Sequence, residues 1–135
     1  MTLTTSLLIA LGAAVGAPTR FLVDRSLNGS WPRGTLLVNV VGSFVLGVAS
    51  GYAIHAAEPP KAMLALVGIG FCGSLTTFGG FAAQTVDLFL LGRSGTGSSS
   101  AKRNTAYLYA SASVVGCVLA GWIGLLIAFQ IWPGL

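Results

Sequence analysis

The chain has 135 residues, of which 54% are hydrophobic and only 7% are charged, and its mean hydropathy is +0.84. Soluble domains carry about 25% charged residues, so seven basic and three acidic side chains are too few to cover a water-exposed globule. The composition therefore indicates a membrane protein. Two cysteines are too few for a disulfide scaffold, and singly scattered basic residues exclude a protein that binds nucleic acid.

Four segments are apolar for long enough to cross a bilayer, which requires about 20 residues per helix. The predicted helices cover residues 5–22, 34–57, 62–91 and 105–132. Because they occupy nearly the whole chain, we expect residues 1–135 to form a single four-helix transmembrane domain. Short connectors make neighbouring helices antiparallel.

The basic residues predict a fixed orientation, since Lys and Arg accumulate on the cytoplasmic side of membrane proteins. With four spans, Lys61 stands alone on one side of the membrane. The other side holds Arg20, Arg25, Arg33, Arg93, Lys102 and Arg103. This bias predicts a multi-pass protein of the cell membrane, surrounded by lipid, with both termini outside.

Polar residues inside membrane spans are costly, so they carry most of the information about function. In the second predicted helix, Thr35, Asn39 and Ser43 are four residues apart and form one stripe of hydroxyl and amide groups. Tyr109 and Ser113 repeat this spacing in the fourth predicted helix. Uncharged donors on two helices fit an anion pathway, although hydrogen bonding between helices would use the same residues.

The third predicted helix contains glycines and β-branched residues between residues 70 and 81, where a regular helix favours neither. We therefore predict a helix break at mid-membrane. Non-helical backbone at this depth is buried in protein or lines a cavity, and its freed carbonyls can bind a hard cation. Phe78 and Phe81 lie beside the break, where aromatic rings either pack in the core or turn their positive edges towards an anion.

Three motifs together resemble the CrcB, or Fluc, family of fluoride channels. They are Gly16-Ala17-x-x-Arg20-Phe21, the run GTLLVNVVGSF at residues 34–44, and the run from Gly73 through Thr76-Thr77-Phe78 to Phe81. The resemblance covers essentially the whole chain, with the motifs in the same order on the same helices.

The resemblance implies an all-α antiparallel dimer of the dual-topology type, with two fluoride pores and a structural Na⁺ at its centre. Backbone carbonyls of Gly73 and Thr76 would hold this Na⁺, which is not transported. The implied function is passive fluoride export, which lowers cytoplasmic fluoride. Because the charge bias of this chain fixes one orientation, we hypothesise an inverted paralogue as the partner, with a homodimer as the alternative.

The resemblance also implies roles for single residues. Asn39 would be the pore amide, Phe78 and Phe81 the fluoride-facing rings, and Tyr109 and Ser113 hydroxyls along the ion path. From the stripe on the second helix we add Thr35 and Ser43 to the pore.

Three positions depart from the family pattern. Gly79 and Gly80 replace hydroxyl residues after Phe78, and Gln84 stands where a glutamate is common.

Two further side chains are given roles outside the pore itself. By the same resemblance, Arg20 would lie in the vestibule or stabilise helix packing. His55, near the end of the second helix, is predicted to be an interfacial side chain.

Two other functions stay open at this point. A small multidrug-type exporter is also a four-helix antiparallel dimer, but such exporters use a membrane-embedded glutamate in the first span, which this chain lacks. A non-transporting membrane assembly subunit would explain the glycines and polar residues equally well. The sequence has no nucleophile with a base, no phosphate-binding loop and no carboxylate pair, so we do not predict an enzyme.

Overall fold

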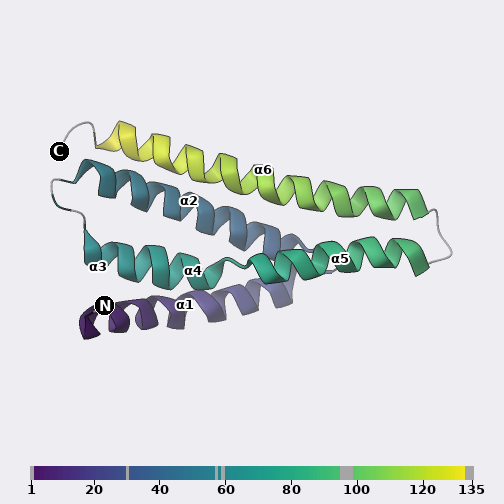
Figure 1. Cartoon of the computed structure of the whole chain (residues 1–135), viewed down its shortest axis with the longest axis horizontal. Helices are drawn as coiled ribbons and strands as arrows, with labels where there is room; N and C mark the ends of the chain where they lie inside the picture. Colours follow the sequence, from purple (N-terminus) through teal and green to yellow (C-terminus); the bar gives the residue numbers. More distant parts are fainter. Residues whose placement is uncertain (1, 30, 57, 59, 95–98, 133–135) are drawn as a thin grey trace.

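The fold is known from a computed structural model, which describes residues 2–29, 31–56, 58, 60–94 and 99–132, with side chains left undescribed at 91–94 and 99–102. The described residues contain no strand and run as helices along one long axis (Figure 1). In chain order these helices are α1 (Leu3–Leu27), α2 (Arg33–His55), α3 (Lys61–Met63), the π-helix η1 (Leu64–Cys72), α4 (Gly73–Leu75), α5 (Phe78–Ser94) and α6 (Ser99–Ile131).

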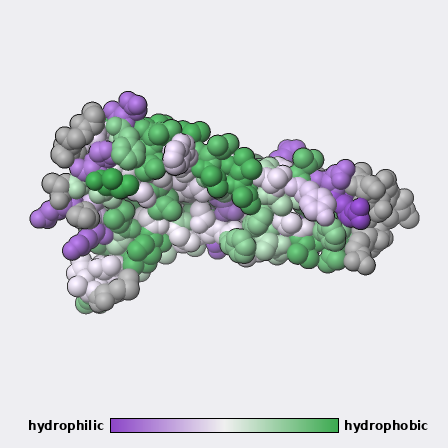
Figure 2. All heavy atoms as spheres, turned by 45° about the horizontal axis from the view of Figure 1, so that its top comes forward, coloured by the Kyte–Doolittle hydropathy of each residue, from purple (hydrophilic) through white to green (hydrophobic). Residues whose placement is uncertain are grey.

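Four helical segments are long and apolar enough to cross a membrane: Leu3–Leu27, Arg33–His55, Lys61–Leu90 and Arg103–Ile131. Little of each span is buried inside the chain, because most large apolar side chains face outwards. Figure 2 shows these hydrophobic side chains over the middle of the molecule and hydrophilic ones towards its two ends. The predictions of an all-helical chain and of a multi-pass membrane protein are therefore confirmed.

Helix α1 is longer than the predicted 5–22, whereas α2 lies close to the predicted 34–57, and Asn28 makes hydrogen bonds at the end of α1 and at the start of α2. The backbone N–H of Asn28 donates to the carbonyl of Asp24 at 3.0 Å and ends α1. Its side-chain oxygen accepts from the N–H of Gly34 at 2.7 Å and of Thr35 at 3.3 Å, which satisfies free donors at the start of α2. As a result α1 continues to Leu27, and Asp24 lies in a helix rather than in the predicted connector.

Close backbone approach sets the packing of α2 against α6. A Cβ atom on Gly47 would collide with the carbonyl oxygen of Gly121, and one on Gly124 would collide with that of Phe44. Small residues permit this contact in a membrane, where lipid gives helices no hydrophobic drive to associate. Figure 1 shows α2 and α6 side by side, with α1 beside the first half of the third span.

The third span is not one regular helix. It starts with α3 and the π-helix η1, continues as α4, loses helical structure at Thr76 and Thr77, and resumes as α5 (Figure 1). Thr76 is extended, with φ −81° and ψ 154°. The side chain of Thr77 then accepts a hydrogen bond from the N–H of Gly80 at 3.0 Å and caps the first turn of α5.

Candidate ion-permeation site

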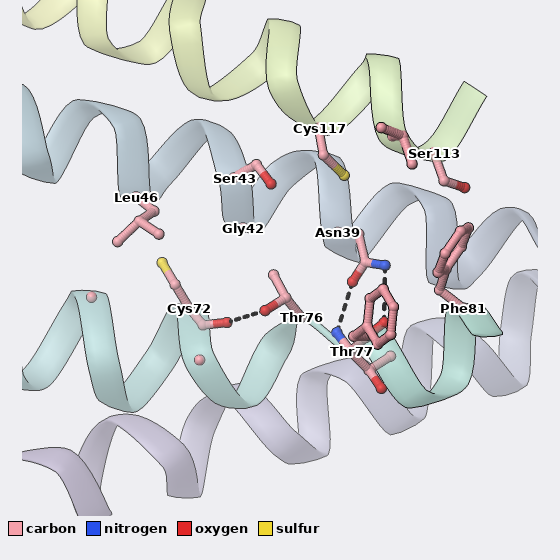
Figure 3. Close-up of a pocket in the computed structure, with 14 residues that line it drawn as sticks. Asn39, Gly42, Ser43, Leu46, Cys72, Thr76, Thr77, Phe81, Ser113 and Cys117 are labelled. Atoms are coloured by element: carbon pink, nitrogen blue, oxygen red, sulfur yellow. Dashed lines mark hydrogen bonds between the residues drawn. The ribbon is translucent and has the colours of Figure 1, made fainter. Parts of the chain in front are cut away.

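A cavity of about 340 Å³ lies beside this interruption, between the third span, α2 and α6 (Figure 3). Seven of the ten predicted site residues line it: Asn39, Ser43, Gly73, Thr76, Phe78, Phe81 and Ser113. Thr35, Tyr109 and Arg20 do not line it. Because none of the lining residues is charged, an ion inside would meet only neutral groups.

Asn39 joins α2 to the interruption through both ends of its amide. Its oxygen accepts from the backbone N–H of Thr77 at 2.8 Å, and its nitrogen donates to the carbonyl of Thr77 at 3.2 Å (Figure 3). The side chain is buried, with 8% of its surface exposed. An amide nitrogen carries two hydrogens, so one hydrogen of Asn39 remains for a ligand in the cavity.

Ser113 of α6 supplies the second donor. Its residue is 3% exposed, and its buried hydroxyl lies near the Tyr109 hydroxyl but makes no hydrogen bond within 3.5 Å among the described residues. Leaving a buried polar group unpaired costs about 1–3 kcal/mol, so such a hydroxyl calls for an explanation. The explanation lies in its position on the cavity wall, where a ligand can accept its hydrogen.

Aromatic rings continue from the cavity to the surface of the chain. The ring centroids of Phe78 and Phe81 are 5.8 Å apart, and those of Phe81 and Tyr109 are 5.7 Å apart. Phe78 is 81% exposed, whereas Tyr109 is fully buried. Phe78 and Phe81 both line the cavity, and Phe78 extends this lining to the surface of the chain.

A second polar cluster, the Thr35 network, consists of Asp24, Asn28, Thr35, Gln84 and Tyr109 and connects α1, α2, α5 and α6. The hydroxyl of Tyr109 donates to the side-chain oxygen of Gln84, and the nitrogen of Gln84 donates to the hydroxyl of Thr35, both at 2.8 Å. The Thr35 hydroxyl in turn donates to the Asp24 carboxylate at 2.9 Å. Asn28 donates to both Asp24 and Thr35 at 3.2 Å.

This network changes the interpretation of two predicted pore residues. Thr35 and Tyr109 each have one hydroxyl hydrogen, and both hydrogens are already donated within the protein. The network therefore favours a structural role for them, and their place in the pore stays a prediction. Sequence reasoning missed Asp24 and Asn28, which it assigned to a connector. It noted Gln84 only as a departure, although an amide within an apolar span was a signal.

The carbonyl oxygens predicted to bind Na⁺ fit a cation only in part. The N–H of Thr76 donates to the carbonyl of Cys72 and that of Thr77 donates to Asn39, so neither of these two groups is spent on the oxygen of Gly73. The carbonyl of Thr76 accepts from the guanidinium of Arg20 at 3.3 Å, so that oxygen keeps one lone pair. Two oxygens of the kind that hard cations prefer are thus available from one chain, and further ligands would have to come from elsewhere.

Arg20 and His55 have contacts outside the cavity. Arg20 is half-buried and links α1 to the interruption through the carbonyl of Thr76, and its role in the vestibule or in helix packing stays a prediction. A ring nitrogen of His55, Nδ1, lies 2.8 Å from the carbonyl oxygen of Gly51, and the ring stacks edge-on to Phe129 with centroids 4.3 Å apart. His55 thus contacts α6 and lies outside the cavity lining.

Comparison with known proteins shows which family this chain is similar to. Residues 7–125 match the family model described as CrcB-like protein, Camphor Resistance (CrcB). The chain is 38% identical over 122 residues to the fluoride-specific ion channel FluC 2 of Rhodococcus jostii, which covers 89% of this chain and 95% of that protein.

Two further relatives show the same similarity. FluC of Pseudomonas aeruginosa is 46% identical over 92 residues, covering 66% of this chain and 72% of that protein. FluC of Caulobacter vibrioides is 32% identical over 131 residues, covering 93% and 96% respectively.

The Thr35 network predicts that Gln84 is important for stability. Replacing it by leucine, Gln84→Leu, removes the acceptor of the buried Tyr109 hydroxyl and one of the two donors to Thr35, which keeps its hydrogen bond from Asn28. We expect a loss of about 1–3 kcal/mol for the unpaired Tyr109 hydroxyl, measured as a lower midpoint of thermal unfolding in detergent. Gln130→Leu, at an exposed position of α6, is the matched control and should change the midpoint little. Equal effects of the two substitutions would contradict the structural role of the network.

Proposed function

This chain belongs to the CrcB-like protein family, and on that basis we propose that it is a fluoride-selective ion channel that lets fluoride leave the cell passively. The relatives that match over most of their length are named as fluoride-specific ion channels. The observation that carries the proposal is the buried, unpaired hydroxyl of Ser113 on the wall of a cavity with an uncharged lining.

The energetics of a small anion explain this choice of residues. Removing the water shell of an ion in a low-dielectric medium costs tens of kcal/mol, so a pore has to replace that shell with hydrogen-bond donors. A fixed Lys or Arg inside the pore would bind the anion too tightly for it to leave. The free hydrogen of Asn39, the hydroxyl of Ser113 and the edge of Phe81 offer several weak contacts in one cavity, which is what conduction requires.

We place the helix interruption at Thr76 and Thr77 near the middle of the membrane and a second, inverted subunit against the open side of the cavity. Two features support this arrangement: Phe78 and Gly73 both line the cavity, and both are exposed on a single chain. A partner on this face would bury Phe78 and complete the wall around the ion path. Carbonyls of Gly73 and Thr76 from both subunits would then surround a structural Na⁺ at the dimer centre.

Removing the unpaired hydroxyl tests the assignment of the pore. A hydrogen bond to a charged partner contributes about 1.5–3 kcal/mol, so Ser113→Ala should lower fluoride efflux from proteoliposomes about tenfold or more. Ser111→Ala is the matched control, because Ser111 is exposed and its hydroxyl donates to the carbonyl of Leu108 on its own helix. Unchanged efflux in Ser113→Ala would remove Ser113 from the ion path.

Phe78→Ile separates a channel from an assembly subunit. Isoleucine keeps the apolar bulk of Phe78 but has no ring edge to face an anion. We expect it to abolish fluoride efflux and to leave the assembled protein intact on size-exclusion chromatography. Efflux equal to that of the unchanged protein would favour the assembly subunit.

The charge bias predicts that this chain needs a partner of opposite orientation. Six of its seven basic residues lie on one side of the predicted topology, so a single orientation is expected in the membrane. Reconstituted alone, the chain should give little fluoride efflux, and co-expression with an inverted paralogue should restore it. Robust efflux from liposomes that contain only this chain would show that it forms a working homodimer.

A further inference from the structure

The interruption of the third span depends on where one backbone hydrogen goes. In a continuous α-helix the N–H of residue 77 would donate to the carbonyl of residue 73. Here the N–H of Thr76 still donates to the carbonyl of Cys72 at 3.0 Å, but the N–H of Thr77 donates to the side chain of Asn39 at 2.8 Å. The carbonyl of Gly73 therefore loses the N–H partner that a continuous α-helix would give it.

Asn39 also prevents the helix from closing. Its amide is buried and pairs with both the N–H and the carbonyl of Thr77. If Thr77 returned to a helical conformation, the buried amide oxygen would lose its donor, at a cost of about 1–3 kcal/mol. The N–H of Thr77 is thus kept away from the carbonyl of Gly73 by a residue on a different helix.

We propose that Asn39 is a positioning residue for the Na⁺ site, because it takes the hydrogen of Thr77 and so leaves the oxygen of Gly73 free to bind the cation. This proposal rests on the Na⁺ site proposed above and is independent of fluoride conduction. It makes one side chain serve two purposes: one amide hydrogen faces the cavity, while the amide oxygen holds the cation site open.

The surroundings of Gly73 agree with this role. Gly73 is exposed and lines the cavity, and a Cβ atom there would meet nothing closer than the carbonyl oxygen of Gly68 at 3.9 Å. The neighbouring oxygen of Thr76 accepts only from Arg20 among the described residues. The two oxygens are therefore kept from helical bonding in different ways, one by Asn39 and the other by the extended backbone of Thr76.

The test measures how Na⁺ stabilises the detergent-solubilised dimer against heat, and the dimer is purified after co-expression with the inverted partner wherever this chain alone gives no fluoride efflux. NaCl is titrated against N-methyl-D-glucamine chloride at constant ionic strength, and the unfolding midpoint is followed, since a ligand that binds only the folded state raises it. Asn39→Leu keeps the side-chain size but cannot accept a hydrogen bond. We expect this variant to need about tenfold to a hundredfold more Na⁺ for half of the stabilisation. Ser113→Ala, in the same cavity but without contact to Thr77, should titrate like the unchanged protein.

A proline at position 77 provides the matching rescue. Proline has no N–H, so in the double variant Asn39→Leu/Thr77→Pro nothing at position 77 can close on the oxygen of Gly73. The extended backbone of Thr76 suits a residue that precedes proline. The double variant should recover the Na⁺ response of the unchanged protein. Should Asn39→Leu not fold, Thr77→Pro alone is used, and it should retain that response.

Three results would overturn the inference. The first is an Asn39→Leu variant that titrates with Na⁺ like the unchanged protein. The second is a folded variant containing Thr77→Pro that does not respond to Na⁺. The third is an unchanged protein without any Na⁺ response. Because fluoride efflux is recorded on the same preparations, efflux without a Na⁺ response would overturn this inference and leave the channel function standing.

Discussion

The whole site depends on one constraint: a backbone N–H or carbonyl in the membrane has to find a partner, because lipid offers none. The third span can leave the helix only because Asn39 takes both polar groups of Thr77 and Arg20 reaches the carbonyl of Thr76. Two side chains from two other helices thus replace the helical hydrogen bonds. The cavity, the turn towards Phe78 and the freed oxygen of Gly73 all follow from these three contacts.

The protein separates polar groups that hold the helices together from polar groups that are free to bind. In the Thr35 network the hydroxyl hydrogens of Thr35 and Tyr109 are both directed to acceptors within the protein, and the chain of hydrogen bonds ends on Asp24. In the cavity, by contrast, the Ser113 hydroxyl has no hydrogen-bond partner in the described part of the chain, and one amide hydrogen of Asn39 is not used by Thr77. Only the second group can replace water around an ion without first breaking a bond.

The sequence was sufficient to predict the four spans and half of the residues that line the cavity. Uninterrupted apolar runs show the spans, and spacing by four placed Asn39 and Ser43 on one face of α2, where both line the cavity. Thr35 shares that spacing but belongs to a different environment, because its partners Asp24 and Gln84 come from α1 and α5. The spacing of residues describes one helix at a time. It therefore could not show that Thr35 belongs to the Thr35 network while Asn39 and Ser43 line the cavity. Asp24 was missed for a related reason: Asn28 extends α1 beyond the end of its apolar run.

Gln84 shows why the Thr35 network needs an amide, and not a carboxylate, at this position. An amide both donates and accepts, so Gln84 can donate to Thr35 and accept from Tyr109 at the same time, which leaves the hydrogen of Thr35 for Asp24. An ionised glutamate at this position could only accept. The single hydroxyl hydrogen of Thr35 could then be donated to only one of two carboxylates. The network would also contain two acidic side chains close to the proposed anion pathway. With glutamine, the network contains one carboxylate, already bonded to Asn28 and Thr35. An amide at position 84 is therefore matched to the presence of Asp24 in α1.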